Sequence, residues 1–457
     1  MTPSANVMPS SGVPPVIPHR LPAAPKRKLG VLAITAICVA AAMLLLLGVA
    51  VIAVGIFRAQ TVAQAEAASQ REKAAQQLAL AQARPPQAGF SEARRTTTAS
   101  SRSEPGVTYT NVIVASEPWS IHVLKIDRSR KDLTLASAHA GKTVLGVSFL
   151  RDQAAAMPRD FGRAIAAVNG DFYDRDDSRY AGDPRGLQII QGELTSAPDT
   201  VCVWFDADGS PHLDEVKGLF YATWPNGRKT QFGLNQRRRS GMTILYTPTY
   251  GPSTRAAGGR ELILEKDGDG SWLPFQAGQT YRARIRTVST TGNTRLTDDV
   301  MVLSFPPDLL ANLPDAAPGT VLQISTGTTP DMKGVKMAIA GGPAIIKDGK
   351  PFASRNPPPG ASGGYSEASK YQRHPRSAVG WSPTHVYLVT ADGRQPGLSV
   401  GMTLAELAEF MAKLGCTQAM NLDGGKSAQM WMNGQIMNSP CQGEDTVANS
   451  ILVIRKP

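Results

Sequence analysis

An apolar run near the N-terminus constrains this chain more than any other feature of its sequence. Residues 29–57 contain no charged side chain, and about 20 apolar residues are enough for a helix to cross a bilayer. The basic cluster Lys26-Arg27-Lys28 precedes the run, and charges of both signs follow it. Because basic residues favour the cytoplasmic side of a membrane, we expect one transmembrane helix with a cytoplasmic N-terminus. Everything after residue 57 would then be extracytoplasmic.

The segments that flank this run have distinct compositions. Residues 1–28 are rich in Pro, Ser and Ala and are expected to form a disordered cytoplasmic tail. Residues 58–106 begin with good helix formers and end in a linker rich in Ser, Thr and Arg, which predicts a helical stalk through which copies could self-associate. A cleaved signal peptide is the alternative to the anchor, because Ala63-Gln64-Ala65 resembles a cleavage site. Signal h-regions, however, run only about 7–15 residues.

Residues 107–457 have the pattern of a β-rich domain. Residues 119–127 alternate as a half-buried strand does, and the apolar residues 164–168 predict a buried strand. Two helices are expected, one over residues 148–156 and one that opens with a capping box at Thr403 and Glu406. The sequence therefore predicts a mixed α/β (α+β) class, with a single β-rich mixed-sheet catalytic domain and few helices.

Composition excludes several classes of function. The formal net charge is +11, but the basic residues are scattered and their densest run, residues 237–239, lacks interleaved aromatic side chains. We therefore expect no nucleic-acid partner. Four cysteines are too few for a disulfide scaffold, although a bridge between Cys416 and Cys441 is open. No cysteine or histidine pattern marks a zinc site, so no cofactor and no metal site are predicted, and a divalent cation stays open.

The strongest candidate for chemistry lies near the C-terminus. A short apolar approach leads to Asn421 and Asp423, and Gly424, Gly425 and Lys426 follow at once. Because glycine has no Cβ, a ligand can approach backbone N–H groups there. A carboxylate beside such amides and a cation suits a substrate whose reacting bond adjoins an anionic group. The alternative is a strand that ends in an ordinary Asp-Gly-Gly turn.

Short motifs elsewhere in the body add further candidates. In chain order they are Asn169-Gly170-Asp171-Phe172, Gly341-Gly342-Pro343, Arg373-His374-Pro375-Arg376-Ser377-Ala378-Val379-Gly380 and Asp392-Gly393-Arg394. Together with the Asn-Leu-Asp-Gly-Gly segment, this ordered set resembles the phosphodiester glycosidase family. The resemblance extends over about residues 107–457, is strong from residue 341 onward, and is weak between about residues 200 and 335.

The resemblance implies that the enzyme cleaves a sugar from a sugar-1-phosphate diester at the anomeric carbon. It makes Asp423 the leading catalytic carboxylate, and Asp171 and Asp392 compete for a second role. Arg376 is the expected bidentate phosphate contact, and Arg373 is a second, weaker candidate for the same role. The other expected substrate contacts are Asn169, Gly170, Gly341, Gly342, Asn421, Gly424, Gly425 and Lys426.

Two positions depart from the family pattern, and both add charge to the expected site. Lys426 stands where the family commonly has a third glycine, and Asp171 stands where it has a small residue. The expected substrate is a sugar phosphate or glycan, for which cell-envelope polymers are candidates. Two alternatives to the enzyme are a non-catalytic module that binds glycans or phosphoglycans and a phosphodiesterase that cleaves at phosphorus. The phosphodiesterase would be expected to need a metal cluster.

Overall fold

The computed structural model describes residues 96–196, 200–353 and 369–457. The tail, the apolar anchor and most of the stalk and linker that the sequence predicts lie outside these residues. Among the helices that the structure describes, none is long and apolar enough to span a bilayer. A strand, β1 (Thr96–Glu104), occupies the end of the segment expected to be a linker, where it pairs with β2 (Val107–Val114).

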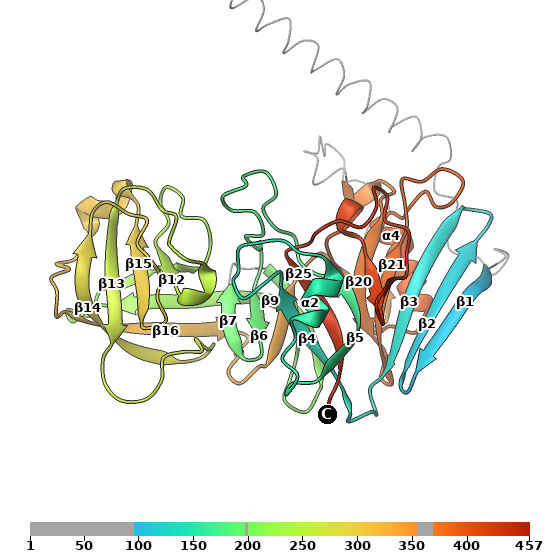
Figure 1. Cartoon of the computed structure of the whole chain (residues 1–457), viewed down its shortest axis with the longest axis horizontal. Coiled ribbons are helices and arrows are strands. Elements are labelled where there is room, and N and C mark those ends of the chain that lie inside the picture. The colour runs from blue at the N-terminus through green and yellow to red at the C-terminus, as the bar shows by residue number, and fades with distance from the viewer. Residues whose placement is uncertain (1–95, 197–199, 354–368) are drawn as a thin grey trace, which may run out of the picture. The chain divides into compact units, whose positions relative to one another are not determined.

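The first sheet has eight strands, and all its neighbouring strands are antiparallel. In spatial order they are β1, β2, β3 (Trp119–Asp127), β21 (His385–Ala391), β20 (Arg376–Trp381), β22 (Gln418–Asn421), β18 (Ala344–Lys347) and β19 (Lys350–Pro351). The helix α4 (Leu404–Lys413) packs its apolar side chains on one face of this sheet (Figure 1). It begins at the predicted capping box, in which Glu406 N donates to Thr403 Oγ1 and Thr403 N donates to the Glu406 carboxylate.

A second sheet, of five strands, packs against the other face of the first. Its spatial order is β24 (Gln435–Ile436), β23 (Met430–Met432), β5 (Arg163–Asn169), β25 (Asn449–Arg455) and β4 (Leu133–His139). Leu124, Val379 and Leu388 of the first sheet share one buried cluster with Val168 and Ile451 of this one. The helix α2 (Leu150–Ala155), predicted over residues 148–156, packs on the opposite face. The layers therefore run helix, sheet, sheet, helix.

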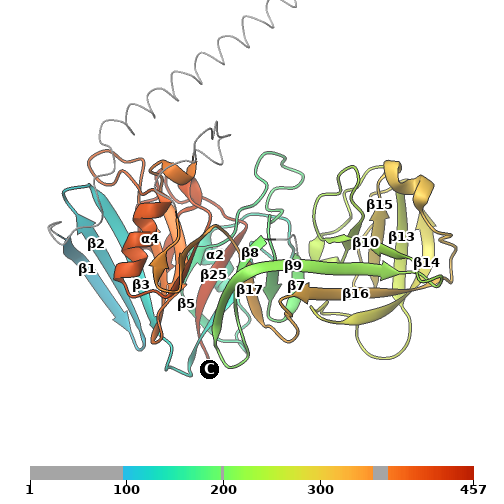
Figure 2. The same ribbon diagram turned by 180° about the vertical axis from the view of Figure 1, so that it is seen from behind.

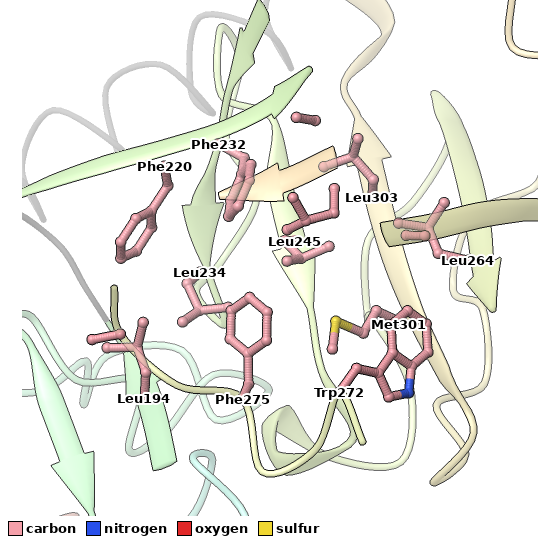
Figure 3. Packing of buried hydrophobic residues seen from close by; sticks show 14 of the residues in the cluster. Leu194, Phe220, Phe232, Leu234, Leu245, Leu264, Trp272, Phe275, Met301 and Leu303 are labelled. Carbon is pink, nitrogen blue, oxygen red and sulfur yellow. The ribbon is translucent and has the colours of Figure 1, made fainter. Parts of the chain in front are cut away.

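The third sheet has twelve strands. From one end to the other it runs β11 (Gly233–Leu234), β12 (Ile244–Tyr246), β15 (Val300–Phe305), β13 (Arg260–Lys266), β14 (Thr280–Ser289), β16 (Val321–Thr329), β9 (Pro211–Thr223), β8 (Thr200–Phe205), β17 (Met337–Ala340), β6 (Gln188–Ile190) and β7 (Glu193–Ser196), with β10 (Lys229–Gln231) paired to β9. Two 3₁₀ turns, η1 (Pro248–Tyr250) and η2 (Pro307–Asn312), lie in its connections. The long strands β9 and β16 lie side by side (Figure 2), and aromatic and aliphatic side chains fill the core beside them (Figure 3).

The predicted mixed α/β class with a single mixed sheet is therefore wrong. The structure is mostly β; α2 and α4 are the α-helices whose bounds lie within the described ranges, and residues 369–371 are also helical. Every pair of named strands is antiparallel except β11 with β12. The reason lies in the connections: between residues 200 and 335 the strands are joined by turns, loops and the 3₁₀ segments η1 and η2, and no α-helical crossover of the kind that joins parallel strands lies there. The open disulfide is not formed either, since Cys416 and Cys441 are both free thiols.

Candidate active site

Strand ends from all three sheets meet at one place. Asn169 ends β5, Asn421 ends β22, and Gly341 follows β17. Gly342 N donates to Asn421 O at 2.7 Å, and Asn421 Nδ2 donates to Gly342 O at 2.9 Å. Asp423 N donates to Gly170 O at 2.9 Å. These bonds fix the first, second and third sheets to one another where the predicted site residues gather.

Asn169 holds this meeting point together. Its side chain is almost fully buried, and its Nδ2 donates to Asp423 O at 2.6 Å. Its Oδ1 accepts from Ser377 Oγ at 2.6 Å and from Gln429 N at 3.2 Å. Because every polar atom of the amide is engaged by protein, Asn169 orients the Asp423 loop, in contrast to the sugar contact expected from the sequence.

The glycines allow close backbone packing. A Cβ at Gly170 would lie 2.3 Å from Asn449 Oδ1, and one at Gly424 would lie 2.6 Å from Pro375 O. Gly425 has a φ of 63° and donates its N–H to Pro375 O at 2.9 Å. Gly424 N donates to Asp423 Oδ1 at 2.9 Å. The amides expected to face a ligand are therefore already used to shape the loop.

Asp423 is close enough to Asp171 to influence its ionisation. Burial raises the pKa of Asp171 from 3.8 to about 7, and the charge of Asp423 contributes to this rise. Hydrogen bonds from the N–H groups of Phe172 and Gly186 partly oppose it. Burial also raises the pKa of Asp423, although the Ser427 hydroxyl opposes this shift. Asp171 is 3% exposed, whereas Asp423 is half-buried. The pair thus consists of a deep carboxyl and one that reaches the surface.

Positively charged side chains surround this pair. Arg175 and Arg185 both lower the pKa of Asp423, and Arg185 also lowers that of Asp171. Arg394 lies next to the same loop, since a Cβ at Gly425 would be 3.3 Å from its Nη1. Arg185, Arg394 and Lys426 are exposed. We call Arg175, Arg185, Arg394 and Lys426 the cationic rim.

Arg376 and Arg373, the predicted phosphate contacts, are engaged elsewhere. Arg376 is 6% exposed, and its guanidinium donates to the carbonyls of Met402 (2.9 Å), Gln372 (3.0 Å) and Ser369. Arg373 pairs with the carboxylates of Glu117 (2.7 Å) and Glu406 (2.5 Å). Both arginines therefore fix the loop before β20 through their Nε and Nη2 atoms.

Asp392 is also saturated by protein. Its Oδ2 lies 2.8 Å from His122 Nε2, and its Oδ1 accepts from Asn438 Nδ2 and Ser439 N, each at 3.0 Å. The chain of contacts continues from His122 Nδ1 to the Tyr109 hydroxyl at 2.8 Å. This buried network positions the turn that carries Arg394, so a catalytic role for Asp392 finds no support in its contacts.

His374 completes the support of Arg394. Its Nδ1 lies 3.2 Å from Arg394 Nη2. Burial and the neighbouring charges of Arg376 and Arg394 lower the pKa of His374 to about 3. The ring is therefore neutral near pH 7, and Nδ1 can accept the Arg394 hydrogen bond.

Comparison with known proteins agrees with this geometry. Residues 287–454 match the family model described as phosphodiester glycosidase. The resemblance read from the motifs is thus confirmed, and the matched residues include the Asp423 loop, Arg376 and Arg394. Asn169, Gly170 and Asp171 lie outside the matched segment, and it is the fold that brings them to it.

Individual relatives are more distant. The protein YomE, derived from the SPbeta prophage of Bacillus subtilis, is 29% identical over 126 residues, which are 27% of this chain and 18% of that protein. Solved structures from Synechocystis (20% identity, TM-score 0.63, covering 80% of this chain and 64% of that one) and Burkholderia pseudomallei (22%, 0.55, 74% and 74%) share the fold.

A third solved structure has a more specific description but lower similarity. It is the catalytic domain of zebrafish N-acetylglucosamine-1-phosphodiester α-N-acetylglucosaminidase, auto-inhibited by its pro-peptide. It is 13% identical, with coverage of 80% of this chain and 88% of that one. Its TM-score of 0.38 is too low to support an argument about this chain.

Sequence reasoning missed most of the cationic rim. Arg394 belongs to the Asp-Gly-Arg motif that carries the resemblance, and its φ of 58° shows that the turn imposes a special conformation on it. Arg185 and Arg175 lie in the loop after Asp171, where no spacing or motif distinguishes them from surface arginines. Only the folded loop brings them beside Asp423.

Proposed function

We propose that this chain is a glycosidase that hydrolyses the anomeric C–O bond of a sugar-1-phosphate diester. The observation that carries the proposal is the placement of Asp171 and Asp423, inside the cationic rim, where the three sheets meet. The family match of residues 287–454 supports the same reaction class. A site that combines two carboxyls with a rim of cations fits a substrate whose anionic group adjoins its reacting bond.

The two carboxyls have different roles in the proposed reaction because they differ in burial. Neighbouring carboxylates disfavour simultaneous ionisation, and burial further disfavours the charged form. Because Asp171 is the deeper carboxyl, the shared proton resides on it and the negative charge on Asp423. That charge faces the sugar and stabilises the positive charge that develops at the anomeric carbon in the transition state.

The cationic rim binds the phosphate. Arg185 and Arg394 are exposed, Arg185 near Asp423 and Arg394 near Gly425, and a guanidinium can bind two phosphate oxygens at once. Neutralising the phosphate stabilises it as a leaving group, so the site depends less on a strong general acid than a site for ordinary glycosides does. Lys426, which stands where the family commonly has a third glycine, adds a flexible charge to the same rim.

Location and natural substrate stay predictions of the sequence. We propose that residues 29–57 anchor the protein with its catalytic domain outside the cytoplasm, where phosphodiester-linked envelope polymers are candidate substrates. A reporter that is active only outside the cytoplasm, fused after Pro457, tests the orientation. Activity of a cytoplasmic reporter at that position, with silence of the first, would contradict it.

The reaction itself is tested with a chromogenic sugar-1-phosphate diester and the full chain. Hydrolysis in ¹⁸O-labelled water should place the label on the sugar, because the anomeric C–O bond breaks. Label on the phosphate would show cleavage at phosphorus and a phosphodiesterase. Binding without any product would show the non-catalytic glycan-binding alternative.

A further inference from the structure

A cavity of about 380 Å³, whose lining contains none of the candidate active-site residues, has no part in the proposed chemistry. It opens between β4, the hairpin of β6 and β7, and the end of α2, and its lining includes His139, Gln191, Glu193, Thr195, Ala156 and Met157. Ligand sites in proteins typically measure about 300–1,000 Å³. The cavity is therefore large enough for a small organic ligand.

The polar groups of its inner wall are uncharged. His139 Nε2 lies 2.5 Å from Gln188 Oε1 and 3.3 Å from Thr195 Oγ1. Since a carbonyl oxygen only accepts, Nε2 carries the proton and Nδ1 is left as an acceptor. Burial lowers the pKa of His139 to about 4, so the imidazole is neutral at physiological pH.

Glu193 adds a second acceptor. Its Oε1 accepts a hydrogen bond from Thr249 Oγ1, and burial raises its pKa. The cation of the lining, Lys142, is exposed. An anionic ligand would thus meet no buried cation, and a cationic ligand would meet a carboxyl whose ionisation the site disfavours.

Apolar groups make up the rest of the lining. Met157, Ile190 and Pro274 contribute carbon and sulfur atoms to the same lining as the hydroxyl, amide and imidazole groups. A ligand that fits this mixed lining has several hydroxyl groups on an uncharged ring with C–H faces. We propose that this cavity binds a neutral sugar unit.

The cavity borders the strand that supports Asp171. His139 of β4 pairs directly with Asn449 of β25, and Asp171 N donates to Asn449 Oδ1 at 2.6 Å. A sugar in the cavity can therefore belong to the same glycan as the sugar at the active site. This last assignment rests on the proposed function, whereas the binding of a neutral sugar does not.

Saturation-transfer NMR on the full chain tests the proposal with glucose, N-acetylglucosamine and glucuronate as probes. At least one neutral sugar should receive magnetisation from the protein, and glucuronate should receive less. Ala156→Trp places an indole at the exposed rim of the cavity and should abolish the signal. Ala155→Trp, one residue earlier on α2, is exposed and outside the lining, so it should keep the signal.

Three results would overturn the proposal: no transfer to either neutral sugar, transfer that persists in Ala156→Trp, or preferential transfer to glucuronate. The last would show an anion site. Hydrolysis of a short chromogenic diester should be unchanged in Ala156→Trp, because the cavity lies outside the reacting groups. Absence of that hydrolysis in the wild type would refute the proposed function and leave the sugar signals as an independent result.

Discussion

Two regions at the same end of the first sheet present charged residues beside glycines, but only one leaves them available to a substrate. After β22, Asp423 is half-buried and Lys426 is exposed. At β20 and β21, Arg376 and Asp392 are at most 6% exposed and are held by carbonyls, by His122 and by a backbone amide. Both regions carry equally recognisable motifs. The difference between the two regions is one of access: Asp423 and Lys426 reach the surface, whereas Arg376 and Asp392 are buried among protein partners.

The contrast between the two regions fails if Asp423 is only a turn residue. Asp423→Asn keeps the shape and removes the charge, so we expect turnover to fall about 10²-fold or more, the scale of losing one electrostatic stabiliser. Substrate binding and the melting temperature should change little. Turnover and melting are measured on one preparation, with Asp298→Asn, an exposed carboxyl of the third sheet, as control. A loss of melting temperature with intact turnover would remove Asp423 from catalysis.

A second test concerns the proton held by Asp171. Its pKa is about 7 in the folded chain against 3.8 ordinarily, so between these values the folded state holds a proton that the unfolded chain has released. The stability contributed by this group is therefore largest below about pH 4 and is lost as the pH rises through about 7.

Melting curves of the wild type and Asp171→Asn measure this effect. The wild type should lose stability relative to Asp171→Asn as the pH rises from 4.5 to 8, because folded Asp171 releases its proton as the pH passes through its pKa of about 7. Taking the difference between the two proteins cancels Asp183, whose pKa burial also raises to about 7. A difference that is flat or of opposite slope would show that Asp171 is ionised throughout.

The supporting region should respond through stability. Arg376→Ala leaves the carbonyls of Met402 and Gln372 without their donor, and buried groups that lose a charged partner cost about 2 kcal/mol or more of unfolding free energy. Turnover per folded molecule should fall less than in Asp423→Asn. Arg130→Ala, which breaks an exposed pair with Asp132, is the control and should have little effect. Unchanged stability with lost phosphate binding would reinstate Arg376 as a substrate contact.

The part of this site that sequence could predict is the part set by local pattern. The apolar runs that precede Asn169 and Asn421 predict that both lie at strand ends, and the capping box predicts the start of α4. Arg185 could not be predicted, because it reaches Asp423 through a loop whose path depends on the contact of Gly186 with β17. The number of sheets could not be predicted from the sequence either, since the pairing of β9 with β16 joins residues that are about one hundred positions apart.

The cationic rim gives a fourth prediction. Arg185→Ala should raise KM for the diester about tenfold, the equivalent of about 1.4 kcal/mol of lost phosphate binding, and leave the melting temperature nearly unchanged because the side chain is exposed. Arg394→Ala should act in the same direction. Arg228→Ala, an exposed arginine of the third sheet, is the matched control. An unchanged KM in both rim variants would place the phosphate elsewhere.

The smallest effect is expected at Lys426, the charge that the family pattern lacks. Its ammonium is exposed, so its attraction to a phosphate is weakened by water and is worth only about 0.2–1 kcal/mol. Lys426→Gly should therefore raise KM only a few-fold at low salt, and the difference from wild type should shrink as ionic strength rises, because salt screens exposed charges. Lys131→Gly, in an exposed turn, controls for the added backbone freedom. A salt-independent loss of turnover would mean that Lys426 contacts the reacting group, and the difference between an exposed rim and a catalytic pair would no longer hold.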